Sequence, residues 1–69
     1  MQIKPDGTKI VHYKNYVISQ NAVNHHVMIS ENNHMVFHSQ CKKPYDENGL
    51  IGIADKYEKL KALVEERDD

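Results

Sequence analysis

The sequence predicts a small α+β domain, in which an antiparallel sheet of three or four strands is followed by one C-terminal amphipathic helix packed on one face. Short segments rich in β-branched and aromatic residues fill the chain up to residue 41, and turn-forming residues separate them. Apolar residues at intervals of three and four then recur from Leu50 to Val64. With 69 residues in all, the chain has room for a single domain over 1–69.

Turn chemistry marks the start of the chain. Residues 1–8 form a turn segment, because the Pro-Asp-Gly sequence at 5–7 combines a preset φ angle with a residue that accepts a positive one. The strands occupy residues 9–41. The first strand segment, 9–19, is either one long bent strand or a short hairpin that turns at 14–15.

Two further strands complete the predicted sheet, over 25–30 and 34–41. A tight turn joins them at Asn32 and Asn33, since asparagine tolerates the left-handed backbone that two-residue hairpin turns require. The short connections make the predicted sheet antiparallel.

A helix is expected over 46–66, after the Lys-Lys-Pro sequence at 42–44 ends the sheet. Asp46 or Asn48 supplies the N-cap, because a side-chain oxygen there can accept a hydrogen bond from an unpaired backbone N–H group. The tail at 65–69 is acidic and expected to fray, since carboxylates at a helix C-terminus oppose the helix dipole. One apolar stripe faces the sheet and consists of Leu50, Ile53, Ala54, Tyr57, Leu60, Leu63 and Val64.

The strands carry more apolar residues than a sheet covered on one side requires. Side chains of a strand alternate between the two faces, so a strand covered on one face should alternate apolar and polar residues. Each predicted strand instead has apolar residues at three successive positions, namely 16–18, 27–29 and 35–37. Because one helix covers only one face, apolar side chains remain on the other face.

The expected register assigns these residues to faces. It pairs Ile29 with Phe37 and Val27 with Ser39, and it places Met35 on the same face as these residues. The opposite face is covered either by loops and the N-terminal segment or by another protein surface. That face carries Val17, Met28 and Val36.

Five histidines invite a metal-binding interpretation, most clearly in the series His34, His38 and Cys41. On a strand, however, His34 and His38 lie roughly 13 Å apart, because the rise is ~3.3 Å per residue. A set across two strands that joins His25 or His26 to His38 is geometrically possible, but zinc sites usually need three or four ligands. We expect no metal site, and histidines that are half-exposed on strands or in contact with a partner.

Size and motifs argue against an enzyme. The chain has no glycine-rich phosphate loop, no Gly-x-Ser-x-Gly sequence and no Cys-x-x-Cys sequence. Cys41 beside a histidine lacks any recognisable oxyanion hole, and a thiol at a strand end usually serves as a small apolar side chain. The sequence therefore predicts neither catalytic residues nor a cofactor.

Charge is unevenly distributed along the chain, although the net charge is only −1. Residues 1–43 carry five lysines and two acids, whereas residues 44–69 carry four bases and eight acids. Apart from the pair at 42–43 the N-terminal lysines are scattered, so direct binding of nucleic acid is not expected. The acidic C-terminal end is either a solvated helix surface or a region that contacts a basic protein surface.

Neither a membrane segment nor a secretion signal is recognisable in the sequence. No stretch approaches the ~20 apolar residues that a membrane-spanning helix needs, and the first residues lack the apolar core of a signal peptide. Cys41 is the only cysteine and has no partner for an internal disulfide. We therefore expect a cytoplasmic protein that makes no membrane contact.

The function predicted from these features is non-enzymatic protein binding through the apolar sheet face and the acidic helix. In size and charge balance the chain is broadly similar to small inhibitor and accessory proteins of phages and mobile elements that block a larger target. The partner is expected to include a second copy of the chain. One alternative is a structural homo-oligomer closed by two-fold symmetry, and another is a sheet that binds nucleic acid. The expected partner-binding residues are Tyr13, Tyr16, Val17, Met28, Val36 and His38.

Overall fold

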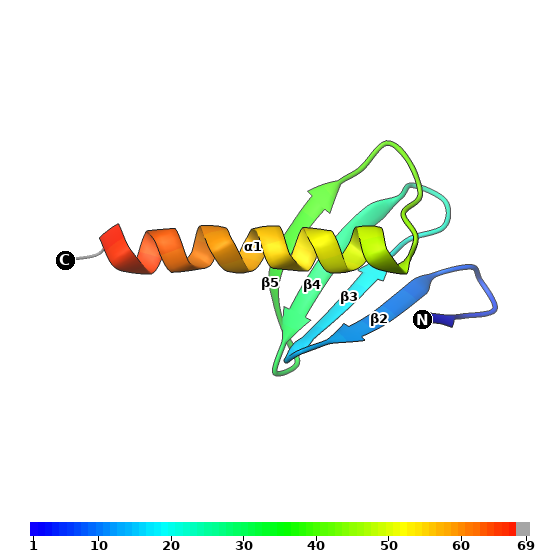
Figure 1. Cartoon of the computed structure of the whole chain (residues 1–69). Coiled ribbons are helices and arrows are strands. Elements are labelled where there is room, and N and C mark those ends of the chain that lie inside the picture. The colour runs from blue at the N-terminus through cyan, green and yellow to red at the C-terminus, as the bar shows by residue number, and fades with distance from the viewer. Residues whose placement is uncertain (68–69) are drawn as a thin grey trace.

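The computed structural model describes residues 1–67, and the side chains of residues 1–64. It confirms an α+β fold, in which an antiparallel sheet in the order β1-β2-β3-β4-β5 is followed by helix α1 (Figure 1). The elements are β1 (Gln2–Ile3), β2 (Lys9–Tyr13), β3 (Tyr16–Gln20), β4 (His26–Glu31), β5 (His34–Gln40) and α1 (Glu47–Arg67).

The sheet has five strands, so the predicted three or four was an undercount. Two features account for the difference. Gln2 pairs with Ile10 and thereby makes β1 from part of the predicted turn segment. The segment at 9–20 is a hairpin rather than one bent strand, since Tyr13 pairs with Tyr16 across the turn.

Backbone conformation at the turns follows from the residue types present. Asn32 and Asn33 both have positive φ, at 52° and 67°, as the tight turn between β4 and β5 requires. Gly7 has a φ of +91°, and a Cβ atom at this position would lie 2.8 Å from the Cβ of Ala22. A side chain at position 7 would therefore both strain the backbone and collide with the β3–β4 connection.

The β4–β5 pairing confirms one part of the expected register and corrects another. Ile29 pairs with Phe37, as predicted. A register shift follows between Ile29 and Ser30, so that Met35 pairs with Ser30 instead of extending the alternation. This β-bulge turns Met35 away from the helix, and its expected position on the helix side was wrong because one extra residue reverses side-chain direction.

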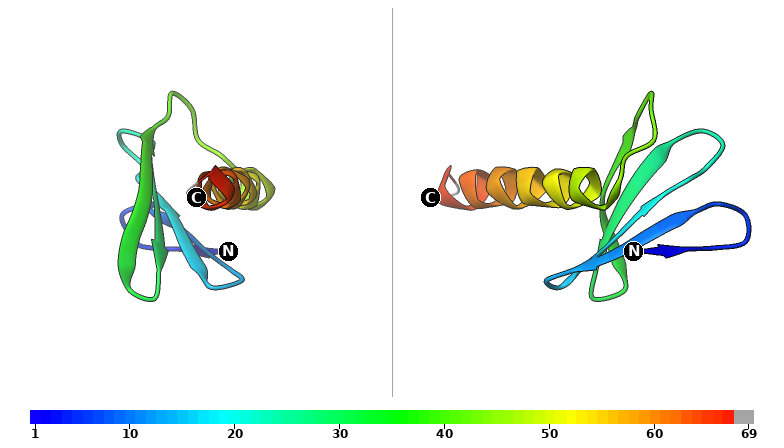
Figure 2. Two further views of the ribbon diagram at one scale, coloured as in Figure 1. Left: turned by 90° about the vertical axis from the view of Figure 1, so that its left-hand side faces the viewer. Right: turned by 45° about the vertical axis from the view of Figure 1, so that its right-hand side comes forward.

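The core lies between the sheet and α1, which packs on one face only (Figure 2). Asp46 caps the helix, since its Oδ1 accepts a hydrogen bond from Gly49 N at 2.8 Å. Side chains from β2, β3 and β4 meet the first turns of α1. The buried apolar residues are Val11, Tyr16, Ile18, Val27, Ile29, Leu50 and Ala54.

Helix α1 is longer than the sheet that it covers, and its C-terminal part extends beyond the ends of the strands (Figure 1). The molecule is accordingly elongated, at 45 × 24 × 19 Å. The expected fraying of 65–69 concerns a segment of which 65–67 have helical backbone and 68–69 lie outside the described residues. Within residues 1–67, no helix is long and apolar enough to span a membrane.

Candidate protein-interaction surfaces

The apolar stripe of α1 is buried in its first half and exposed in its second. Leu50 and Ala54 have no exposed surface. The three apolar residues that follow Tyr57 on the same helix, Leu60, Leu63 and Val64, are 50%, 55% and 66% exposed. We call the segment from Leu60 to Arg67 the free half-helix, because its large apolar side chains are exposed and its C-terminal end extends past the sheet (Figure 1).

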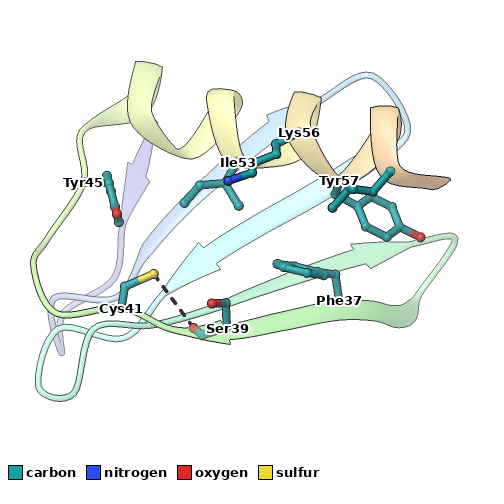
Figure 3. Close-up of a pocket in the computed structure, with 8 residues that line it drawn as sticks. Phe37, Ser39, Cys41, Tyr45, Ile53, Lys56 and Tyr57 are labelled. Carbon is teal, nitrogen blue, oxygen red and sulfur yellow. Dashed lines mark hydrogen bonds between the residues drawn. The ribbon is translucent and has the colours of Figure 1, made fainter. Parts of the chain in front are cut away.

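A groove runs between α1 and β5, the strand at the free edge of the sheet. Ile18, Val27 and Ile29 on the inner strands are completely buried, whereas Phe37 and Ser39 of β5 are only half-buried. The helix thus covers the middle of the sheet and leaves a groove of about 220 Å³ over β5 (Figure 3). Its lining consists of Phe37, Ser39, Cys41, Tyr45, Ile53, Lys56, Tyr57 and Leu60.

The groove continues onto the free half-helix. A second, more open hollow of about 400 Å³ shares Phe37, Tyr57 and Leu60 with the first and extends to Lys61 and Val64. Phe37 and Tyr57 mark the junction, with ring centroids 5.6 Å apart. The result is one continuous apolar surface that starts beside Tyr45 and ends on the free half-helix. We call it the helix–edge surface.

The end of the groove next to Tyr45 is fixed by one buried polar side chain. Gln20 is 2% exposed, and its Oε1 accepts a hydrogen bond from Tyr45 N at 2.8 Å. Its Nε2 donates to the carbonyl oxygens of His25 and Lys43, at 3.1 and 3.0 Å. Gln20 therefore connects the β3–β4 turn to the β5–α1 loop and holds Tyr45 in place.

Four of the predicted partner-binding residues lie together on the opposite side of the sheet, which we call the open sheet face. Its centre is Met28 and Val36, which are 42% and 36% exposed, beside the half-buried Val17. Within the described strands β2 to β5, no lysine, arginine, aspartate or glutamate points to this side. The face comprises Ile10, His12, Val17, Ser19, His26, Met28, Ser30, Met35, Val36, His38 and Gln40.

The other two predicted residues, Tyr13 and Tyr16, lie on the helix side. The Tyr13 hydroxyl donates to Asp55 Oδ1 at 2.8 Å, and this hydrogen bond raises the pKa of the phenol. Tyr16 is 5% exposed and packs edge-on against Tyr57. Burial raises the pKa of the Tyr16 phenol, and its hydroxyl donates to Glu58 at 3.3 Å. Both tyrosines thus hold α1 to the β2–β3 hairpin.

The acidic residues in the middle of α1 are similarly engaged within the molecule. Glu58 accepts a hydrogen bond from Lys14 Nζ at 2.9 Å, which lowers the pKa of the carboxyl group. Glu31 at the end of β4 pairs with Lys61 at 3.2 Å. In the sequence, most of the acidic excess that follows residue 43 lies in 65–69, where four acids accompany one arginine.

The histidines are distributed over several elements. His26 and His38 stack on the open sheet face with ring centroids 5.3 Å apart, so the strands bring together the pair that the sequence left possible. His26 Nδ1 lies 3.2 Å from Gln40 Oε1. Among the described residues, no three His, Cys, Asp or Glu side chains are close enough together to hold a metal ion.

Sequence reasoning did not identify the helix–edge surface. Leu60 and Val64 were assigned to the covered stripe, because periodicity shows which side of a helix is apolar and not how far its partner extends. One available signal was the length of the predicted elements. A helix of 21 residues spans about 31 Å, whereas a five-residue strand spans about 17 Å.

The chain was also compared with known proteins. No protein-family model, no curated protein sequence and no solved structure matches it.

Proposed function

We propose that this protein is a non-enzymatic protein-binding module that occludes a surface of a larger target protein through its open sheet face. The observation that supports this proposal is an apolar centre on a face that no described segment covers (Figure 2). The N-terminal segment could have covered it, but β1 pairs beside β2 at the sheet edge instead. An apolar patch exposed in this manner is typical of an interaction site.

The chemistry of the open sheet face favours a protein target. Contact would desolvate no carboxylate, ammonium or guanidinium group of this face, so burial carries little electrostatic cost. Met28 and Met35 have flexible side chains that can adapt to a partner of irregular shape. Nucleic acid is a poorer fit, since phosphate binding requires clustered lysine or arginine residues.

The proposal places the protein in a reducing compartment such as the cytoplasm. Cys41 is a free thiol that is only half-buried in the groove. In an oxidising compartment this thiol would be prone to form intermolecular disulfides. Binding through the open sheet face does not require such a disulfide.

The experiment is affinity capture from a lysate of the source cells, with the wild-type protein and a Met28→Ser/Val36→Ser variant immobilised in parallel. Mass spectrometry then identifies the retained proteins. We expect a target that the wild type retains and the variant loses, because both substitutions remove apolar contact area from the centre of the face. Circular dichroism of the variant should match that of the wild type.

A Val23→Ser variant is the matched control. Val23 is an exposed apolar residue, 87% accessible, in the β3–β4 turn and outside the open sheet face. This variant should retain the target. A target that all three proteins bind equally, or that only the Val23→Ser variant loses, would contradict the assignment of the face.

A further inference from the structure

We propose that the helix–edge surface is an interface between two copies of this chain, which pair side by side and antiparallel about a two-fold axis near Leu60. Each free half-helix would lie in the groove of the other copy. This inference concerns a different surface from the proposed function, and either can hold without the other. It would leave both open sheet faces exposed, giving a bivalent binding module.

The first supporting observation is that the groove and the free half-helix match in length. From Leu60 to Arg67 the half-helix extends about 11 Å, at 1.5 Å per residue. The opposite wall of the groove, from Phe37 on β5 to Cys41 directly after it, extends about 13 Å. One chain thus carries both a groove and an apolar segment that fits it in length, so two copies related by a two-fold axis would fill both grooves at once.

The second observation is the order of residues along α1. In two antiparallel helices that meet at Leu60, each residue after Leu60 in one copy lies beside a residue before Leu60 in the other copy. The two residues are the same number of positions from Leu60. Val64 of one copy would then lie beside Lys56 and Tyr57 of the other, which line the groove. Leu60 would meet Leu60. The exposed apolar residues of the half-helix therefore meet apolar groove walls and the aliphatic stem of a lysine.

Charge complementarity selects the antiparallel arrangement. The chain end at 65–69 carries a net charge of −3. The opposite end of the groove is lined by Tyr45, and Lys43 Nζ lies 5.6 Å from the centre of the Tyr45 ring. Lys42 precedes Lys43, and Lys56 lines the groove. An antiparallel pair directs the C-terminal end of each α1, where the sequence is acidic, toward the end of the other copy that carries these lysines, whereas a parallel pair brings like charges together.

The test is the mass of the protein in solution by sedimentation velocity, from about 1 µM to about 1 mM, a range that covers weak and moderate affinities. We expect the wild type to change from monomer to dimer. A Leu60→Glu/Val64→Glu variant should weaken association at least about 30-fold, because it introduces four unpaired carboxylates into an apolar interface. Both residues are at least half-exposed in the monomer, so the variant should remain folded.

Two further measurements distinguish this interface from the open sheet face. The Met28→Ser/Val36→Ser variant should dimerise like the wild type, and its loss of target capture would concern the proposed function alone. Raising the salt concentration should weaken the wild-type dimer, since it screens the attraction between the acidic ends and the lysines. Should the glutamate variant fail to fold, Leu60→Ser/Val64→Ser removes apolar contact without adding charge.

Three results would overturn the proposal. One is a wild-type protein that stays monomeric up to millimolar concentration. Another is a dimer that the Met28→Ser/Val36→Ser variant loses and the Leu60→Glu/Val64→Glu variant keeps, because the open sheet face would then be the self-association surface. The third is an assembly that grows beyond a dimer without limit, since a two-fold contact closes on itself.

Discussion

The two halves of α1 have similar apolar content and different surroundings. In the first half, Leu50 and Ala54 are buried completely against β2 and β3. In the second half, Leu60, Leu63 and Val64 continue along the helix and are at least half-exposed. The difference arises because a helix of 21 residues is longer than strands of five to seven residues. Helix periodicity alone therefore does not distinguish a core residue from an interface residue.

The largest expected effect belongs to the buried half. Leu50→Ala should lower the free energy of unfolding by about 3 kcal/mol, because it leaves a cavity in a fully covered site. Leu63→Ala should change it by less than about 0.5 kcal/mol in the monomer, since the side chain is already 55% exposed. Urea denaturation at low micromolar concentration measures both. Equal effects would show that the two halves are equally buried.

Gln20→Ala should have the next largest effect and lower the free energy of unfolding by about 2 kcal/mol. The substitution leaves Tyr45 N and the carbonyl oxygens of His25 and Lys43 without their side-chain partner. Because Gln20 holds the loop that precedes the buried half of α1, amide hydrogen exchange should accelerate at Tyr45 and remain unchanged at Leu63. Faster exchange along the whole helix would indicate that Gln20 has no local role.

Asp46→Ala tests the N-cap of α1, where the buried half begins. It should lower the free energy of unfolding by about 1 kcal/mol. The substitution removes the carboxylate that accepts the hydrogen bond from Gly49 N. Asp46→Asn is the matched control, because asparagine is an equally good N-cap and should retain most of the stability. Thermal unfolding followed by circular dichroism compares the three proteins. An alanine variant as stable as the asparagine variant would exclude a capping role.

The smallest effect on stability is expected for Glu58, which lies in the middle of α1. The hydrogen bond from Lys14 lowers the pKa of Glu58, whose ordinary value is 4.5. A carboxylate with a lowered pKa in the folded state stabilises the fold above its ordinary pKa, and this contribution is lost as the pH falls through the lowered value. Glu58→Gln should therefore reduce stability slightly at pH 7 and not at pH ~2. An equal loss at both pH values would contradict an ionic role for Glu58.

The fold was largely predictable because its signals are local. Asp46 was one of the two predicted N-caps, and the left-handed backbone at Asn32 and Asn33 follows from the residue type alone. Position 2 was assigned to a turn segment, because a two-residue strand has too few positions to show alternation. The reversed direction of the Met35 side chain depends on a β-bulge that no residue type in β5 predicts.

The interaction surfaces were predictable only in part. Val17, Met28 and Val36 share a face as expected, since Val17 and Met28 each lie between two core residues and Val36 precedes Phe37, which faces the helix. Tyr13 and Tyr16 instead contact the helix, and their hydroxyl groups bond to acids more than 40 residues away. The helix–edge surface depends on where α1 crosses the sheet, which is a tertiary property that sequence periodicity does not encode.

Cross-linking between copies tests the antiparallel pairing most directly. Cys41 lines the groove and is the only cysteine, so a Val64→Cys variant contains one thiol in the groove and one on the free half-helix. Within one copy, Val64 lies about 16 Å along the helix beyond Ile53, which lines the groove with Cys41. A short bismaleimide should therefore join Cys41 of one copy to position 64 of the other and produce a covalent dimer on a denaturing gel.

Lys59→Cys is the control, because position 59 is exposed, does not line the groove and lies about 120° around the helix from Ile53. The antiparallel pairing predicts efficient cross-linking for Val64→Cys and little for Lys59→Cys. Peptide mapping should identify the bond as one between position 41 and position 64. Equal cross-linking of the two variants, or a bond only between the two copies of Cys41, would contradict the pairing.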